Sequence, residues 1–266
     1  MRKVLAMARA SWLTALSYRL DTFFSFTGLL VGIIPLYFVS RALQPMMASS
    51  IRTQAPEYFG FLMIGLFAFS FATVAVGAVH GALSSEISSG SLEALVSTPT
   101  SVPVLILGMV AQPFSMHVIK GVFVFIAACL LGLHVVWMSS VTALFILALI
   151  TACYLAIGIF AAALVLGFRT TGPFPAAVLT VSGLLGGVYY PTDVIPAWLG
   201  RFSGFVPLTY GLRALRRSLL DGVPLSHSMR DLAILTAFTL AFTLGSMIAF
   251  RWALRYAKHA GTLAQY

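Results

Sequence analysis

Six long apolar runs divide the sequence, and this feature limits the fold more than any other. A helix needs about 20 mostly apolar residues to cross a bilayer core, whereas a strand of a membrane barrel needs about ten residues of alternating polarity. The runs are long and do not alternate, so they favour helices. The predicted spans cover residues 22–40, 58–80, 114–134, 140–165, 173–190 and 232–254.

The composition excludes a soluble domain. Of the 266 residues, 60% are hydrophobic and 9% are charged, with a mean hydropathy of +0.99, whereas soluble domains are about half apolar and a quarter charged. We therefore predict an all-α integral membrane protein with a single transmembrane domain over residues 1–266. The net charge of +9 suits membrane lipids with anionic headgroups. No basic cluster interleaved with aromatic residues lies outside the spans, so no nucleic-acid partner is expected.

Residues 1–21 carry four basic side chains among apolar ones, which fits either an interfacial helix or a basic cytoplasmic anchor. Charged and polar residues interrupt this segment too often for a cleavable signal peptide. Six spans put both termini on one side of the membrane. If that side is cytoplasmic, it receives eight basic residues against seven opposite, with Lys120 left inside a span, so the positive-inside rule narrowly favours cytoplasmic termini. Residues 41–57 are predicted to form a polar loop.

The segment 187–222, between spans five and six, is too polar for a span and too apolar for a soluble loop. Proline is accepted in the first turn of a helix and breaks its interior. We therefore expect Pro196 and Pro207 to open two short helices, over residues 197–203 and 208–220, and Gly222 to end the second one. Such a pair indicates a re-entrant or interfacial helical hairpin. We predict that it forms the extracytoplasmic gate of a pathway, because non-helical backbone at membrane depth needs surrounding protein or a water-filled cavity.

A second polar segment, residues 84–99, separates spans two and three. Ser91 is a suitable N-cap for a short helix, and Pro99 stops that helix. The helix is too short and too polar to cross a membrane. It fits either a solvated loop or a rigid cytoplasmic coupling helix on which an ATPase pushes, with two leucines as apolar anchors and a glutamate as an orienting charge.

Together the two segments resemble the signatures of ABC type-2 exporter permeases, the membrane subunits of ATP-driven exporters of drugs, lipids and polysaccharides. In the hairpin the matching positions are Gly187, Pro191, Ile195, Pro196, Trp198, Leu199, Pro207, Leu208, Thr209, Tyr210, Arg213 and Gly222. In the loop between spans two and three they are Glu86, Gly90, Leu92, Glu93, Leu95 and Pro99. The resemblance covers nearly the whole chain.

The resemblance implies two copies of this chain, as a homodimer, with two copies of a separate ABC ATPase. It also implies a prokaryotic-type cell (inner) membrane, cytoplasmic termini and ATPase coupling through residues 84–99. The implied gate residues are Gly187, Pro191, Pro196, Trp198, Pro207 and Tyr210.

The sequence contains no nucleotide-binding loop, since none of its three lysines closes a Gly-x-x-x-x-Gly-Lys pattern. ATP and Mg are therefore expected on the partner ATPase, with no cofactor bound by this chain. Cys129 and Cys153 lie inside apolar runs, and the five histidines lack ligand spacing, so no metal site and no catalytic residue are predicted.

Two sets of charged or titratable side chains have alternative interpretations. Arg213, Arg216 and Arg217 are spaced to share one helical face, where they either contact an anionic group or reach towards lipid headgroups. His80, His117 and Lys120 lie in or near the spans and either contact substrate or lipid, or extend to the interface.

The function that these features predict is the transmembrane permease subunit of an ATP-driven exporter. The chain would form the pathway for an amphipathic or lipid-linked substrate and would not itself be an enzyme. Two alternatives remain open. A membrane-embedded lipid-modifying enzyme would need a nucleophile or an acid–base set near the arginines, where only Asp193 and Asp221 are available. An ATP-independent secondary carrier would be expected to show intramembrane carboxylates, and no row of them is present.

Overall fold

The computed structural model describes residues 19–52, 54–88, 102–168 and 172–259. In chain order the helices are α2 (Arg19–Ile51), α3 (Tyr58–Ser88), α5 (Val102–Leu130), α6 (Ser140–Phe168), α7 (Phe174–Leu185), α8 (Ala197–Ser203), α9 (Pro207–Leu219) and α10 (Met229–His259). Short 3-10 turns lie at Trp137–Ser139, Thr192–Val194 and Leu225–Ser228. No strand occurs in the described ranges, in agreement with the predicted all-α class.

Within the described residues, five helices are long and apolar enough to cross a membrane: Phe23–Ile51, Tyr58–Ser85, Pro113–Leu130, Trp137–Gly167 and Leu225–Tyr256. They correspond to predicted spans one to four and six. The predicted fifth span, residues 173–190, holds α7, whose 12 residues extend about 18 Å against a hydrocarbon core of about 30 Å. Because α7 alone does not form a full crossing, the six-span topology stays a prediction.

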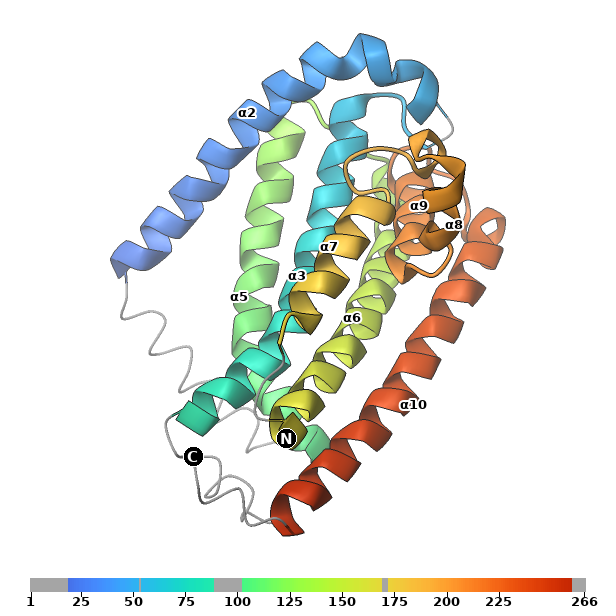
Figure 1. The fold of residues 1–266 in the computed structure, drawn as a ribbon. Coiled ribbons are helices and arrows are strands. Elements are labelled where there is room, and N and C mark those ends of the chain that lie inside the picture. The colour runs from blue at the N-terminus through green and yellow to red at the C-terminus, as the bar shows by residue number, and fades with distance from the viewer. Residues whose placement is uncertain (1–18, 53, 89–101, 169–171, 260–266) are drawn as a thin grey trace.

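The polar loop predicted over residues 41–57 is shorter in the structure, because α2 continues to Ile51 and contains Pro45. A proline inside a helix removes one hydrogen bond and bends the axis without always ending the helix. The ribbon of α2 bends near its C-terminal end (Figure 1). There, Gln44 Oε1 accepts the backbone N–H of Tyr58 at 2.6 Å, so α2 caps the first turn of α3.

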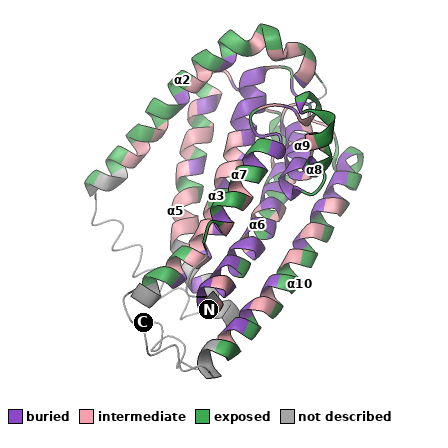
Figure 2. Ribbon diagram, viewed as in Figure 1, coloured by how far each residue is buried: buried purple, intermediate pink, exposed green. Residues whose placement is uncertain are grey.

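The helices α3 and α6 form the centre of the bundle. The helix α10 packs along α6, α2 and α5 pack on the α3 side, and α9 is seated against α3, α6 and α10 (Figure 1). Ala72 and Ala75 of α3 and Ala161 of α6 are fully buried, as small residues are where membrane helices approach closely. Figure 2 shows burial concentrated on α3, α6 and α9, while α2 and α10 are largely exposed.

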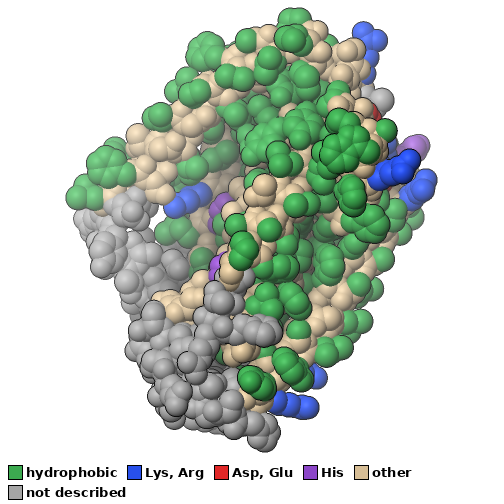
Figure 3. Space-filling view, in the orientation of Figure 1, with side chains coloured by type: hydrophobic (Ala, Val, Ile, Leu, Met, Phe, Trp, Pro, Cys, Tyr) green, Lys and Arg blue, Asp and Glu red, His purple; other side chains and the backbone are tan. Residues whose placement is uncertain are grey.

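Apolar side chains cover much of the outer surface (Figure 3). Phe23 and Phe38 on α2, Leu144 on α6 and Leu244 on α10 each expose more than half of their side-chain surface. Exposed apolar side chains in this number are unfavourable in water and are expected against lipid. The surface therefore fits an integral membrane protein.

One end of the bundle gathers α8, α9 and the chain turns at residues 54–57 and 131–139 (Figure 1). Backbone hydrogen bonds hold this end together, for example from Val136 N–H to Leu219 C=O at 2.8 Å. The C-terminal ends of α3, α6 and α10 lie at the opposite end. The segment 187–222 and the C-terminal end of α3 are thus separated by the length of α3 (Figure 1).

Candidate functional site

The segment 187–222 folds as two short helices. The helices α8 (Ala197–Ser203) and α9 (Pro207–Leu219) confirm the bounds predicted from the two prolines to within one residue. Gly187 and Gly222 have positive φ angles of 79° and 63°, which non-glycine residues adopt only at a cost in free energy. The first turns the chain after α7, and the second turns it after α9.

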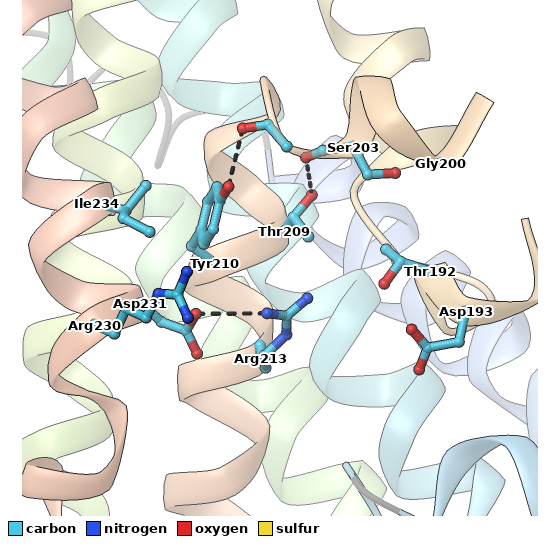
Figure 4. A pocket seen from close by; sticks show the side chains of 11 residues that line it. Thr192, Asp193, Gly200, Ser203, Thr209, Tyr210, Arg213, Arg230, Asp231 and Ile234 are labelled. Atoms are coloured by element: carbon cyan, nitrogen blue, oxygen red, sulfur yellow. Dashed lines mark hydrogen bonds and ion pairs between the residues drawn. The ribbon is translucent and has the colours of Figure 1, made fainter. Parts of the chain in front are cut away.

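Hydrogen bonds within the hairpin fix the turn between α8 and α9. The hydroxyl of Thr209 donates to Ser203 C=O at 3.0 Å, and the hydroxyl of Tyr210 donates to Gly204 C=O at 3.0 Å (Figure 4). Both hydroxyls come from the first turn of α9, so the prolyl start of this helix positions the end of α8. The hairpin is therefore a unit with its own internal bonds.

Arg216 is the centre of the contact between the hairpin and the bundle. Its side chain is 1% exposed. Its Nε and Nη2 atoms donate to Phe61 C=O at 3.2 and 3.0 Å, and Nη2 also donates to Val188 C=O at 3.2 Å. Nη1 donates to Gln54 Oε1 at 3.3 Å, and the guanidinium lies 3.4 Å from the centre of the Phe61 ring. One side chain of α9 thus joins α3, the turn before α3 and the backbone after α7.

Burial of this kind opposes the charged form of the side chain and lowers the pKa of Arg216 to about 9. The side chain is still protonated at neutral pH. Every hydrogen-bond acceptor that the guanidinium contacts is a neutral oxygen, and no carboxylate pairs with it among the described residues. A buried cation is stable when its donors are satisfied and a ring face lies against it.

Gly65 makes room for this contact on α3. A Cβ atom at this position would lie 2.4 Å from Val188 O and 2.6 Å from Arg216 Nη2. The hydroxyl of Tyr58, also on α3, donates to Tyr189 C=O at 2.8 Å. Two successive carbonyls after Gly187 are therefore held by side chains, one by Arg216 and the next by Tyr58.

The spacing of the three arginines suggested that they share one face of α9, but in the structure they do not. Arg213 and Arg217 lie on the partly exposed side of α9, and their Nη1 atoms are 3.6 and 3.5 Å from the carboxylate oxygens of Asp231. Arg216 points in the other direction, because successive helical residues are about 100° apart. Its donors are occupied and its side chain is buried, so the geometry offers Arg213 and Arg217, not Arg216, to an anionic group.

The predicted gate residues occupy different environments. Gly187, Pro191 and Pro207 are buried, whereas Pro196 and Trp198 are exposed. Trp198 exposes 69% of its surface, and Phe202 and Phe205 near it expose 55% and 74%. These aromatic side chains give the hairpin an apolar outer edge, as is typical of a membrane interface.

The predicted ATPase-coupling residues cannot be compared in the same way. Glu86 lies near the C-terminal end of α3. The remaining five lie outside the described residues: Gly90, Leu92, Glu93, Leu95 and Pro99. The interfacial segment predicted before the first span lies outside them too, apart from the start of α2.

An apolar pocket of ≈ 520 Å³ lies between α2, α3 and α5. It contains two of the polar groups singled out in the sequence. Lys120 Nζ donates to Ser25 Oγ at 2.5 Å, and His117 Nε2 lies 3.1 Å from Ser70 Oγ. Both side chains thus have partners on neighbouring helices, and Lys120 lies well inside α5, away from either end. Phe67 and Phe69 line the same pocket.

Sequence reasoning missed four partners of the arginines: Asp231, Gln54 and the carbonyls of Phe61 and Val188. A helical carbonyl that accepts an arginine leaves no mark in a sequence. For Arg216 itself a signal was available, because Leu212 and Leu219 lie four residues before and three residues after it and are buried. Arg216 is therefore part of the apolar stripe of α9.

The fold and the hairpin define an all-helical integral membrane protein, and no cluster of His, Cys, Asp and Glu among the described residues is placed to hold a metal ion. The family model of the ABC-2 type transporter matches residues 3–220. The chain therefore belongs to the ABC-2 type transporter family, whose members are permease components rather than catalytic enzymes and normally work with a separate ATPase subunit. No curated protein matches the chain.

Proposed function

We propose that this permease is the membrane subunit of an ATP-driven exporter of an amphipathic or lipid-linked substrate. Two copies would assemble with two copies of a separate ATPase, which would bind ATP and Mg. The complex would lie in a prokaryotic-type cell (inner) membrane with both termini cytoplasmic. The hairpin 187–222 would then close the extracytoplasmic end of the pathway.

The observation that carries this proposal is the connection between the hairpin and α3. Arg216 attaches the hairpin to Phe61, near the start of α3, and α3 continues without a break to Ser88. Its 31 residues extend about 46 Å. The proposed coupling segment, residues 84–99, begins at the far end of this helix. A push there would be transmitted along one rigid element to the backbone that holds the hairpin.

The pocket between α2, α3 and α5 supports an amphipathic substrate. Its wall is apolar apart from a few polar side chains, among them Lys120 and His117. A single ammonium in an apolar wall suits a molecule with a large hydrocarbon part and an acidic or hydroxyl-bearing end. The exposed apolar faces of α2 and α7 are where the second copy would pack.

The test is transport by the permease and its ATPase in proteoliposomes, with Glu93→Ala and Leu92→Asp as variants. Both should uncouple ATP hydrolysis from transport or detach the ATPase, while membrane insertion stays normal. Glu57→Ala is the matched control, because Glu57 lies just before α3, at the opposite end of that helix.

Normal transport by both variants would show that residues 84–99 do not couple the two subunits. Transport that persists without ATP and stops when the proton gradient is removed would favour a secondary carrier. Modification of lipid by the purified chain alone would favour an enzyme.

A further inference from the structure

Two neighbouring cavities lie on the side of the hairpin that faces α10. The first, which we term the polar pocket, has a volume of ≈ 370 Å³ and is lined by Asp193, Ser203, Arg213 and Arg230 among others (Figure 4). The second, which we term the apolar groove, has a volume of ≈ 570 Å³ and lies between α6, α7 and α10. Neither is the pocket beside α2 in which we place the transported substrate.

The residues that line the two cavities follow one another along the chain. Ser203 and Gly204 line the polar pocket, and the next three residues, Phe205 to Pro207, line the apolar groove. On α10, Arg230 to Ile234 border the polar pocket, and Ala241 to Ser246 border the groove.

A row of aromatic rings connects the two cavities. The ring centre of Tyr210, in the polar pocket, lies 6.2 Å from that of Phe238. Phe238 in turn lies 5.7 Å from Phe242, in the groove. The path from Arg230 to Gly245 along α10 is about 22 Å, which is close to the depth of one membrane leaflet including its headgroups.

The polar pocket carries opposite charges on opposite walls. Arg213 points into the space between Asp231, with which it pairs, and Asp193 on the other side (Figure 4). Asp231 is already shared with Arg217. Arg230 and Asp193 have no ion-pair partner among the described residues, and both are exposed. One wall therefore carries Arg213 and Arg230 with Asp231 between them, and the opposite wall carries the carboxylate of Asp193.

Ser203 adds an independent sign that a polar group belongs here. Its side chain is 4% exposed, and its Oγ has no hydrogen-bond partner among the described residues. A buried polar atom without a partner is unfavourable and calls for an explanation. Ser203 lines the polar pocket, so a rotation of its side chain would bring Oγ to a ligand oxygen there.

We propose that the polar pocket and the apolar groove form one binding site for a membrane phospholipid with an amine in its headgroup. The phosphate lies against Arg213 and Arg230, the ammonium lies against Asp193, and one acyl chain occupies the groove. Arginine binds phosphate through charge-assisted hydrogen bonds, and an apolar groove opening to the membrane accepts a hydrocarbon chain. The site depends neither on the direction of transport nor on the identity of the transported substrate.

The test is native mass spectrometry of the full-length permease released from detergent with palmitoyl-oleoyl phosphatidylethanolamine. A Cβ at Gly245 would meet no atom within 4 Å, so Gly245→Leu should place a side chain in the groove that Gly245 lines. Gly77→Leu is its control, because Gly77 is equally open and borders neither cavity. Arg230→Gln removes a lining cation that has no ion-pair partner among the described residues, and Arg201→Gln, at exposed Arg201, is its control. Each pocket variant should bind the lipid about tenfold more weakly than its control.

The proposal is overturned if Gly245→Leu and Arg230→Gln retain the lipid as their controls do. Loss with Gly245→Leu alone would mean that the groove binds hydrocarbon without headgroup recognition. If Gly245→Leu changes the number of permease copies in the complex and leaves lipid binding intact, the groove is a protein interface.

The headgroup assignment has a test of its own. Wild-type permease should prefer phosphatidylethanolamine to phosphatidylglycerol, because only the former has an amine for Asp193. Asp193→Asn should remove this preference. Equal preference in the wild type and in the variant would refute the role of Asp193.

Discussion

Replacement of Arg216 by methionine should destabilise the permease strongly. The substitution keeps an apolar stem and removes the hydrogen bonds to Phe61 C=O, Val188 C=O and Gln54. A hydrogen bond to a charged group contributes about 1.5–3 kcal/mol, and the desolvation of the guanidinium offsets part of the sum. We therefore expect a loss of about 3 kcal/mol in the free energy of unfolding.

Arg213→Met is the matched control, since it changes the same residue type on the same helix. The side chain of Arg213 is 32% exposed, and Asp231 keeps Arg217 as a partner when Arg213 is lost. Partly exposed ion pairs contribute about 1 kcal/mol or less. At about 2–4 °C per kcal/mol, thermal unfolding in one detergent should fall by about 6–12 °C for Arg216→Met and by less than about 4 °C for Arg213→Met.

Gly65→Ala tests the same contact from the side of α3. Its Cβ would displace Arg216 Nη2, so it should destabilise by about 1–3 kcal/mol, as overpacking does. In the double variant with Arg216→Met, Gly65→Ala should lower the free energy of unfolding by less than it does in the wild type, because the two changes act on one contact. Equal unfolding temperatures for Arg216→Met and Arg213→Met, or full additivity of the Gly65 change, would refute the role we give to Arg216.

Two further changes test the hairpin and the core. Gly187→Val forces a branched residue to a φ of 79°. It should raise the ATP-independent leak of loaded proteoliposomes, whereas Gly200→Val should not. An unchanged leak would contradict the proposed role of the hairpin as a gate. Tyr154→Phe removes the 2.7 Å hydrogen bond to buried Ser182 and should cost about 1–2 kcal/mol in thermal unfolding. Tyr256→Phe, at an exposed position, should leave the unfolding temperature unchanged. An equal loss in both variants would contradict the stabilising role of the hydrogen bond between Tyr154 and Ser182.

Much of the fold could be predicted from the sequence because lipid imposes a simple length rule on helices. The two short helices of the hairpin were also predictable, since Pro196, Pro207 and Gly222 each have a strong local preference. The short length of α7 could not be predicted from the sequence. The run over residues 173–190 is apolar throughout, and hydropathy does not reveal that the chain turns at Gly187.

The arginine cluster shows a second limit of sequence reasoning. Spacing of three and four residues suggested one face, but positions 213 and 216 are about 60° apart around a helix, enough to separate a surface from a core. Neighbouring leucines carried the information that distinguishes them. One partner of Arg216 is a backbone carbonyl of a helix 155 residues away in sequence, and only tertiary structure reveals such a contact.

The neutral partners of Arg216 have a consequence for a membrane whose two sides differ in acidity. A carboxylate that holds a cation releases it when acid neutralises the carboxylate. The carbonyl oxygens of Phe61 and Val188 have no charge to lose. The attachment of the hairpin to α3 should therefore stay the same in acidic and neutral surroundings.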